Sequence, residues 1–234
     1  MIRKNIQLSN HTVAIEYIVP IGVKDENVLA IFLHEALGSI NQWRNFPQLI
    51  CDKLGINGFV YERQGHGNSS DFTSNRSANY LHESAYVELD ELLKILIPQG
   101  KKVILIGHSD GASIALLYAA KFPKLVAGIV SMAAHVVNEP ETIAGIIPAV
   151  EAFQAGKLSG LRKFHGDKTE TLFYAWANSW LSESFRSWNI FSEIQGICCP
   201  VLAIQGKEDQ YGTKLQLDLI QQAVQSLKFN SWRE

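Results

Sequence analysis

The stretch "VILIGHSDGASIALL", residues 103–117, places one serine, Ser109, between two glycines that lie two positions away on either side. The apolar residues before the serine are typical of a buried strand, and those after it are typical of a buried helix. A G-x-S-x-G motif in this context predicts a tight strand-to-helix turn that holds the serine hydroxyl up for attack. Ser109 is therefore the candidate nucleophile.

A serine nucleophile also needs hydrogen-bond donors for the oxyanion that develops on its substrate. One donor of this kind is the backbone N–H of the residue after the serine, here Asp110. The second comes from the loop after an earlier strand. The sequence "HEALGS" (34–39) follows the apolar run 28–33, and we expect Ala36 to supply this second backbone N–H.

Composition limits the class of protein. The chain has 234 residues with 47% hydrophobic and 19% charged residues, which fits one α/β domain with a small insertion. The net charge is −2 and basic residues do not cluster, so we expect neither a nucleic-acid partner nor a membrane surface. Three cysteines, two of them adjacent, favour a reducing compartment over a disulfide framework.

Targeting and metal motifs give no positive signal. The first residues alternate polar and apolar side chains instead of forming the apolar core of a signal peptide, and no run reaches eighteen apolar residues. The sequence has neither C-x-x-C nor H-E-x-x-H. We therefore predict a cytoplasmic protein without a metal and without a cofactor.

The hydrophobic pattern alternates between strands and helices along most of the chain. It predicts strands at 5–9, 12–19, 28–33, 58–61, 101–107, 125–135, 199–206 and 226–232, and helices at 79–97, 111–121 and 213–225. This alternation predicts the α/β class, with a mostly parallel central sheet and helices on both faces.

One segment, residues 138–192, breaks this rhythm. It has no good strand pattern but is dense in aromatic residues, namely Phe153, Phe164, Phe173, Tyr174, Trp176, Trp180, Phe185 and Trp188. We predict a small helical cap here, inserted into a core formed by residues 1–137 and 193–234. Its rings either line a pocket above Ser109 or pack the cap helices against each other.

Four motifs in order resemble those of the α/β-hydrolase superfamily, over about residues 5 to 230. "HEALGS" resembles the oxyanion loop, "ERQGHGNS" (62–69) resembles the R-x-G-x-G-x-S loop, and "GHSDGA" (107–112) resembles the nucleophile elbow. "CPVLAIQGKEDQYG" (199–212) resembles the strand and turn that carry the acid of the catalytic triad. The resemblance implies an α/β-hydrolase fold.

The resemblance also implies roles for single residues. Asp209 would be the acid that orients and stabilises an imidazolium; Glu208 has the same chemistry, but the motif favours Asp209. Glu35 stands where the family usually has glycine. An inward carboxylate would oppose an oxyanion, so we expect Glu35 to point away from the site.

The base of the triad is missing from its usual place. The family orders its triad as serine, acid and histidine, and no histidine follows Asp209. We therefore expect a hydrolase that is truncated at its C-terminus before the catalytic histidine. Two alternatives stay open: a non-catalytic binding protein with the same fold, or a substitute base, either His135 or His165.

The motifs together predict a serine hydrolase. It would cleave a carboxylic ester or a related acyl bond of a small apolar or aryl acyl substrate, through an acyl-enzyme. Cleavage of a C–C bond, as in the meta-cleavage-product hydrolases, and thioester hydrolysis are alternatives. The sequence does not predict the oligomeric state.

Overall fold

The computed structural model describes residues 2–73 and 76–224. In these residues seven strands form one sheet: β1 (Ile2–Gln7), β2 (Thr12–Ile18), β3 (Asp25–Leu33), β4 (Ile56–Glu62), β5 (Lys102–His108), β6 (Val126–Met132) and β7 (Val201–Ile204). Their spatial order is β1-β2-β4-β3-β5-β6-β7. The pairs β1–β2 and β2–β4 are antiparallel, and the remaining pairs are parallel.

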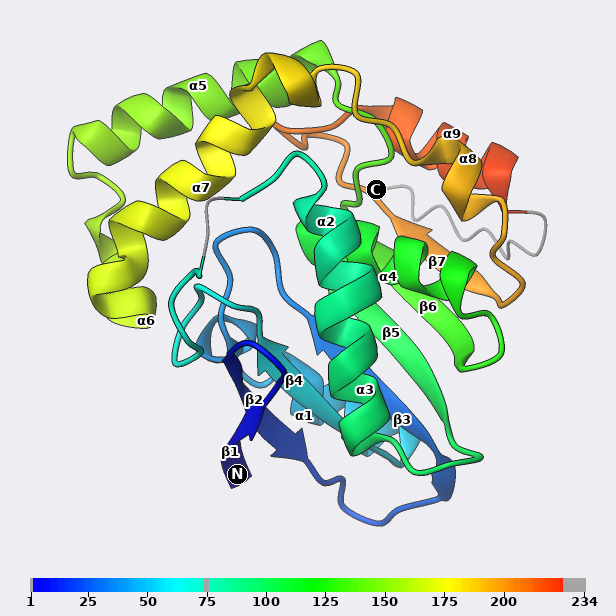
Figure 1. Ribbon diagram of the computed structural model, residues 1–234. Helices are drawn as coiled ribbons and strands as arrows, with labels where there is room; N and C mark the ends of the chain where they lie inside the picture. The colour runs from blue at the N-terminus through cyan, green and yellow to red at the C-terminus, as the bar shows by residue number, and fades with distance from the viewer. Residues whose placement is uncertain (1, 74–75, 225–234) are drawn as a thin grey trace.

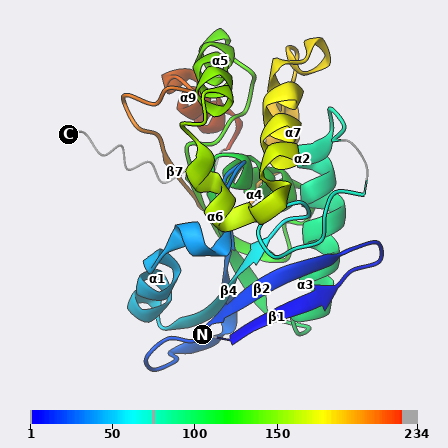
Figure 2. The same ribbon diagram turned by 90° about the vertical axis from the view of Figure 1, so that its left-hand side faces the viewer.

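Helices cover both faces of this sheet (Figures 1 and 2). Along β3, Ile31 and Leu33 join the core under the helices α2 (Tyr80–Glu83), α3 (Asp90–Leu96) and α4 (Asp110–Lys121). The alternate residues Ala30 and Phe32 join the core under α1 (Phe46–Leu54). A strand that is buried on both faces has a continuous apolar sequence, as residues 28–33 do. The predicted fold class is confirmed.

Several predicted boundaries were wrong. β1 begins at Ile2 instead of residue 5, and β6 ends at Met132 instead of residue 135. The helix expected at 79–97 consists of α2, a π-helical segment (Ser84–Leu89) and α3. The strand expected at 226–232 lies outside the described residues.

Helix α1 was not predicted at all. Pro47 lies in its first turn, and Gly55 ends it in the left-handed conformation at φ 68°. Proline near a helix start and glycine just after its end are the signals that the sequence offered.

Residues 138–192 are helical, as predicted. They contain α5 (Pro140–Gln154), α6 (Arg162–His165), α7 (Thr169–Leu181) and the start of α8 (Phe191–Ile194). Figures 1 and 2 show α5, α6 and α7 together at one end of the sheet. Phe153 of α5 stacks on Phe173 of α7 with their ring centroids 3.9 Å apart. That this segment is a separate cap domain stays a prediction.

The last described helix, α9 (Lys214–Ala223), begins as predicted with Thr213 as its cap. The Thr213 side chain accepts a hydrogen bond from Leu215 N–H at 3.1 Å. The side chain of Gln216 does not complete a capping box, because its Nε2 donates to Val137 O and to Glu139. Gln216 thus joins α9 to the segment that leads into α5.

Candidate active site

Ser109 occupies the turn between β5 and α4. Its backbone angles are φ 52° and ψ −119°, a conformation that residues other than glycine rarely adopt. A Cβ on Gly111 would lie 2.0 Å from the carbonyl oxygen of Leu33, and one on Gly107 would lie 2.3 Å from that of Gly111. The strained turn therefore depends on both glycines. The predicted strand–turn–helix geometry is present.

Ser109 lines a cavity of about 510 Å³. The other residues predicted for the site, Ala36, Asp110 and Asp209, line the same cavity. Each follows the carboxyl end of a parallel strand: Ala36 follows β3, Asp110 follows β5 and Asp209 follows β7. Carboxyl ends of parallel strands meet at one edge of a sheet, which is why residues far apart in sequence converge here.

The loop that carries Ala36 is fixed by the loop 62–69. Arg63 Nη1 donates to His34 O at 2.6 Å, and its Nη2 donates to Glu35 O at 2.9 Å. The imidazole of His66 contacts Ala36 O through Nε2 at 3.0 Å. Burial lowers the pKa of His34 and of His66 well below 6.5, so both rings are neutral. These contacts hold the backbone of Ala36 in place.

Asp110 is the first residue of α4, where a backbone N–H has no acceptor within the helix. Its side chain is 1% exposed and turns inward. Oδ2 of Asp110 accepts a hydrogen bond from the Tyr80 hydroxyl at 2.9 Å, and that hydroxyl accepts one from Trp180 Nε1 at 2.7 Å. Sequence reasoning missed Tyr80, which no local motif distinguishes.

The carboxylate of Asp209 is held by its own turn. Oδ1 accepts the N–H of Tyr211 at 2.8 Å, and Oδ2 accepts Nε2 of Gln205 at 2.8 Å. His108 lines the cavity as well. Burial lowers the pKa of His108, against an upward effect of the Asp209 charge. Tyr211 also lines the cavity. It is a second residue that the sequence reading missed, although it stands only two positions after Asp209.

The structure distinguishes between the two histidines proposed as substitutes for the base. His135 lines the cavity, and its Nε2 donates to Tyr211 O at 3.0 Å. Its Nδ1 is buried and has no hydrogen-bond partner among the described residues. His165 is not among the lining residues, and both of its ring nitrogens are engaged: Gly67 N–H donates to Nδ1, and Nε2 donates to Leu37 O.

The expected orientation of Glu35 was wrong. Glu35 lines the cavity, and its carboxylate accepts the N–H of Leu37 at 2.6 Å. Burial raises the pKa of Tyr211, and the Glu35 carboxylate raises it further, which places this carboxylate near Tyr211 in the cavity wall. Burial, opposed by the Leu37 hydrogen bond, raises the pKa of Glu35 to about 7. A large fraction of this carboxyl is therefore uncharged at neutral pH.

The predicted cap contributes aromatic rings to the cavity, but only two of the eight. Trp176 and Trp180 of α7 line it, together with Ile146 of α5. Phe153 and Phe173 instead pack between α5 and α7, so both readings of the aromatic residues are partly right.

Two further observations concern other classes of site. Within residues 2–73 and 76–224, no three His, Cys, Asp or Glu side chains gather as a metal ion would require. None of the helices in the described part of the chain is long and apolar enough to cross a membrane.

Comparison with known proteins places this geometry in a family. The sequence profile of the α/β hydrolase fold family matches residues 30–171. A proline iminopeptidase of Saccharolobus solfataricus is 30% identical over 108 residues; the match covers 46% of this chain and 34% of that protein. The chain thus matches about a third of the length of this curated relative.

Solved structures show the same fold. The enol-lactonase from Burkholderia xenovorans LB400 superposes with a TM-score of 0.72 at 15% identity, covering 97% of this chain and 90% of that one. A structure from a study of carboxylesterases of Nitrososphaera gargenis gives 0.73 at 19% identity, covering 97% and 88%. The match of the profile to more than half of the residues shows that the chain belongs to the α/β hydrolase fold family.

Proposed function

We propose that the chain is a serine hydrolase that cleaves a carboxylic ester or related acyl bond of a small apolar substrate. Ser109 attacks the acyl carbon and forms an acyl-enzyme, which water then releases. The backbone N–H groups of Ala36 and Asp110 stabilise the oxyanion, and Asp209 is the acid. The observation that carries the proposal is the strained turn at Ser109, open to a cavity that these three residues also line.

The lining of the cavity favours a neutral substrate. Leu37, Ile146, Trp176 and Trp180 supply apolar surface. Four carboxyl residues line it too, Glu35, Asp110, Glu208 and Asp209, and no Lys or Arg occurs among its described lining residues. The Asp110 carboxylate turns inward to Tyr80 and much of Glu35 is uncharged at neutral pH, so Glu208 and Asp209 are the main repelling charges. They would repel a substrate with a negative charge near its acyl group, so we place neutral esters first.

The proton acceptor in this chain is His135 in our proposal. Because Nε2 of His135 donates to a carbonyl oxygen, the neutral ring keeps its lone pair on Nδ1, which has no partner among the described residues. His165 is unsuitable because both of its nitrogens are engaged by backbone groups. Among the described residues, His135 makes no hydrogen bond to Asp209, whose carboxylate accepts from Gln205 and Tyr211 instead. The His135 imidazolium would therefore lack the carboxylate that orients and stabilises it in a triad, and we expect slow turnover.

Cleavage of a neutral aryl ester tests the assignment. Ser109→Ala should lower kcat/KM by about 10³-fold or more, because the nucleophile is lost. Ser187→Ala removes an exposed hydroxyl from outside this cavity and should leave the rate unchanged. Equal rates for Ser109→Ala and the parent chain would mean that Ser109 is not the nucleophile. No turnover by either would favour the alternative that the chain is a non-catalytic binding protein.

The base is tested separately. His135→Gln should lower the rate by about 10²–10⁴-fold, the usual contribution of a general base. His108→Gln and His165→Gln are the matched controls, one inside the cavity and one outside it. If His135→Gln has the parent rate while Ser109→Ala is inactive, the hydrolase assignment stands and the base assignment fails.

A further inference from the structure

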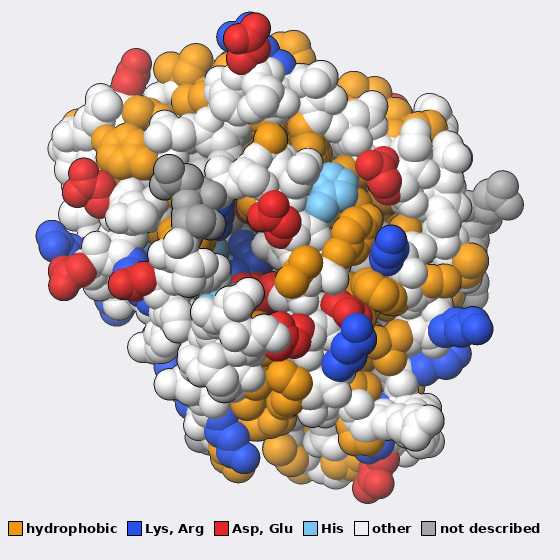
Figure 3. All heavy atoms as spheres, in the orientation of Figure 1, with side chains coloured by type: hydrophobic (Ala, Val, Ile, Leu, Met, Phe, Trp, Pro, Cys, Tyr) orange, Lys and Arg blue, Asp and Glu red, His pale blue; other side chains and the backbone are white. Residues whose placement is uncertain are grey.

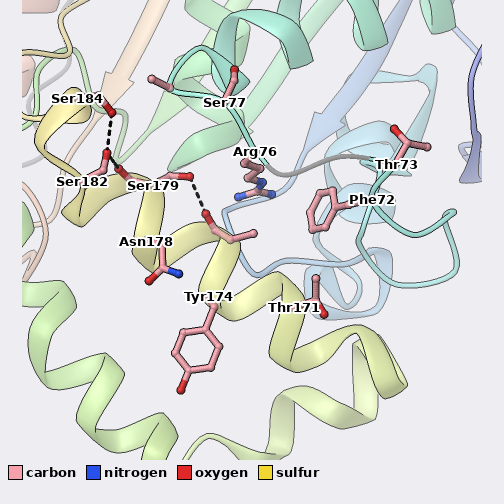
Figure 4. A pocket seen from close by; sticks show the side chains of 12 residues that line it. Phe72, Thr73, Arg76, Ser77, Thr171, Tyr174, Asn178, Ser179, Ser182 and Ser184 are labelled. Atoms are coloured by element: carbon pink, nitrogen blue, oxygen red, sulfur yellow. Dashed lines mark hydrogen bonds between the residues drawn. The ribbon is translucent and has the colours of Figure 1, made fainter.

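A second cavity, of about 670 Å³, lies between α7 and the residues 72–73 and 76–78 (Figure 4). The surface in Figure 3 is hollowed between the helical layer and the core, and a basic side chain, drawn in blue, is visible inside the hollow. Its size is within the range of sites for small ligands. It shares no lining residue with the cavity of Ser109.

Helix α7 separates the two cavities. Trp176 and Trp180, one turn apart, face the cavity of Ser109. Thr171, Tyr174 and Asn178, spaced by three and four residues, line the second cavity from the opposite face of the helix. The two faces differ in chemistry, since one is aromatic and the other carries hydroxyl and amide groups.

The second cavity is lined by hydrogen-bonding groups around one cation. Hydroxyl and amide side chains come from both of its walls: Thr73, Ser77, Thr171, Asn178, Ser179 and Ser184. Arg76 is the only charged residue among the lining residues that the structure describes. The hydroxyls of Ser77 and Ser179 already donate to Glu83 and to Ala175 O. Thr73, Thr171 and Asn178 keep donors for a ligand, and a guanidinium beside such donors is a set of groups that binds oxyanions.

The guanidinium of Arg76 is held in place by aromatic rings. Its Cζ lies 4.6 Å from the ring centroid of Tyr80 and 5.1 Å from that of Phe72. Figure 4 shows the guanidinium beside Phe72 and across from α7. Burial is the largest influence on Arg76 and lowers its pKa. An arginine side chain is not deprotonated in proteins, so the cation persists.

Arg76 is partly buried, and the charges of Asp110 and Glu88 favour its cation without forming an ion pair with it. Its Nη1 is buried without a hydrogen-bond partner, and it forms no ion pair with an Asp or Glu in the described part of the chain. An unpaired buried donor is costly, and native structures usually satisfy such groups. An acceptor with negative charge, supplied from the cavity, would satisfy it.

We propose that this cavity binds a small hydroxylated molecule that carries an oxyanion, either a carboxylate or a phosphate, with Arg76 as the anchor. The hydroxyl and amide side chains on α7 contact the hydroxyl groups of that molecule. The site does not depend on the role of Ser109, because α7 separates the two cavities and the cavity of Ser109 is lined by carboxyl groups.

Calorimetric titration of the whole chain tests the proposal with three matched probes: glycerol 3-phosphate, glycerate and glycerol. At least one of the two anions should bind with saturation, and the tighter one identifies the oxyanion. Glycerol should bind far more weakly, because it lacks the charge. Binding of glycerol as tight as that of both anions, or no binding of either anion, would overturn the proposal.

Variants locate the binding. Arg76→Gln should weaken binding of the anion by tenfold or more, while Arg162→Gln, which removes an exposed cation elsewhere on the chain, should leave it unchanged. If Arg76→Gln fails to fold, the exposed position 178 gives a second test. Asn178→Asp should weaken binding and Asn178→Lys should tighten it, each by about threefold or more. Equal affinities for these two variants would overturn the proposal.

The binding test is independent of the proposed hydrolase activity. Ser109→Ala should bind the anion with the parent affinity, even though its turnover is lost. If binding falls with Ser109→Ala, the anion occupies the cavity of Ser109 and the second site is wrong. If the anion binds and the chain has no Ser109-dependent turnover, only the hydrolase proposal fails.

Discussion

The two cavities beside α7 differ in how their walls are built. The cavity of Ser109 is formed largely at the carboxyl ends of β3, β5 and β7, where glycines allow backbones to approach closely. The second cavity is formed by residues of α7, by Ser182 and Ser184 just after it, and by residues 72–73 and 76–78. A strained serine therefore belongs to the first, where the sheet supports the strain. The second has no comparable backbone feature among its described residues.

The cavities also differ in charge. Four carboxyl residues line the first, and one guanidinium lines the second. The difference indicates that they suit different molecules: a neutral acyl compound beside Ser109 and an anion beside Arg76.

Gly111→Ala should unfold or severely destabilise the chain. Its Cβ would lie 2.0 Å from the carbonyl oxygen of Leu33, and backbone of β3 cannot move aside without disturbing the sheet. We expect a loss of about 4 kcal/mol or more in the free energy of unfolding. Gly160→Ala is the control, because nothing lies within 4 Å of its added Cβ, and it should change stability by less than about 0.5 kcal/mol. If urea unfolding gave similar losses of stability for Gly111→Ala and Gly160→Ala, the close backbone approach at Gly111 would not be needed for the fold.

Tyr80→Phe should cost about 3 kcal/mol of stability. The change leaves the buried Asp110 carboxylate without its Tyr80 donor and Trp180 Nε1 without its acceptor. Tyr174→Phe, on the side of the second cavity, is the matched control and should cost little. Thermal unfolding of both variants measures the contrast. Equal costs would mean that the Trp180–Tyr80–Asp110 chain contributes no more than a surface hydroxyl.

Glu35 should make stability depend on pH. Its pKa is about 7 in the folded state against an ordinary value of 4.5, so between these values the folded state holds more protons than the unfolded state. The contribution of Glu35 to the free energy of unfolding therefore falls as pH rises from 4.5 to 7 and is constant above that range. The parent should lose on the order of 2 kcal/mol relative to Glu35→Gln between pH 5 and pH 8, measured by urea unfolding. Exposed Glu151→Gln should show no such difference from the parent.

The charge of the substrate should affect turnover by about tenfold. A neutral aryl acetate should be cleaved with a kcat/KM about ten times that of an aryl hemisuccinate, whose acyl group carries a carboxylate. Glu208→Gln removes one of the repelling groups from the first cavity and should bring the kcat/KM values of the two esters closer together. A preference for the hemisuccinate would contradict the assignment of neutral substrates to this cavity.

The sequence predicted the features of the site that depend on a few neighbouring residues better than those that depend on distant contacts. The turn at Ser109 was predictable because glycines two positions away on each side, with apolar runs beyond, encode it locally. Asp209 needed the resemblance to a family, since a carboxylate in a loop carries no signal of its own. The sheet class followed from alternating strands and helices.

Properties that depend on tertiary contacts were not predictable. The carboxylate of Glu35 lies at the cavity because the Leu37 N–H holds it there, which a loop sequence does not reveal. His135 and His165 were equivalent in the sequence and differ only in what their nitrogens contact in the fold. The aromatic residues of the 138–192 segment are evident in the sequence, but which of them line the cavity is not. That depends on which face of α7 packs toward the cavity.

Covalent labelling with an aryl fluorophosphonate tests the central claim, that Ser109 is a nucleophile, most directly. The reagent phosphonylates an activated serine and is read by intact mass and by peptide mapping. We predict one adduct per chain, located on Ser109, and no adduct in Ser109→Ala. An unlabelled parent chain, or an adduct on another serine that persists in Ser109→Ala, would contradict the account.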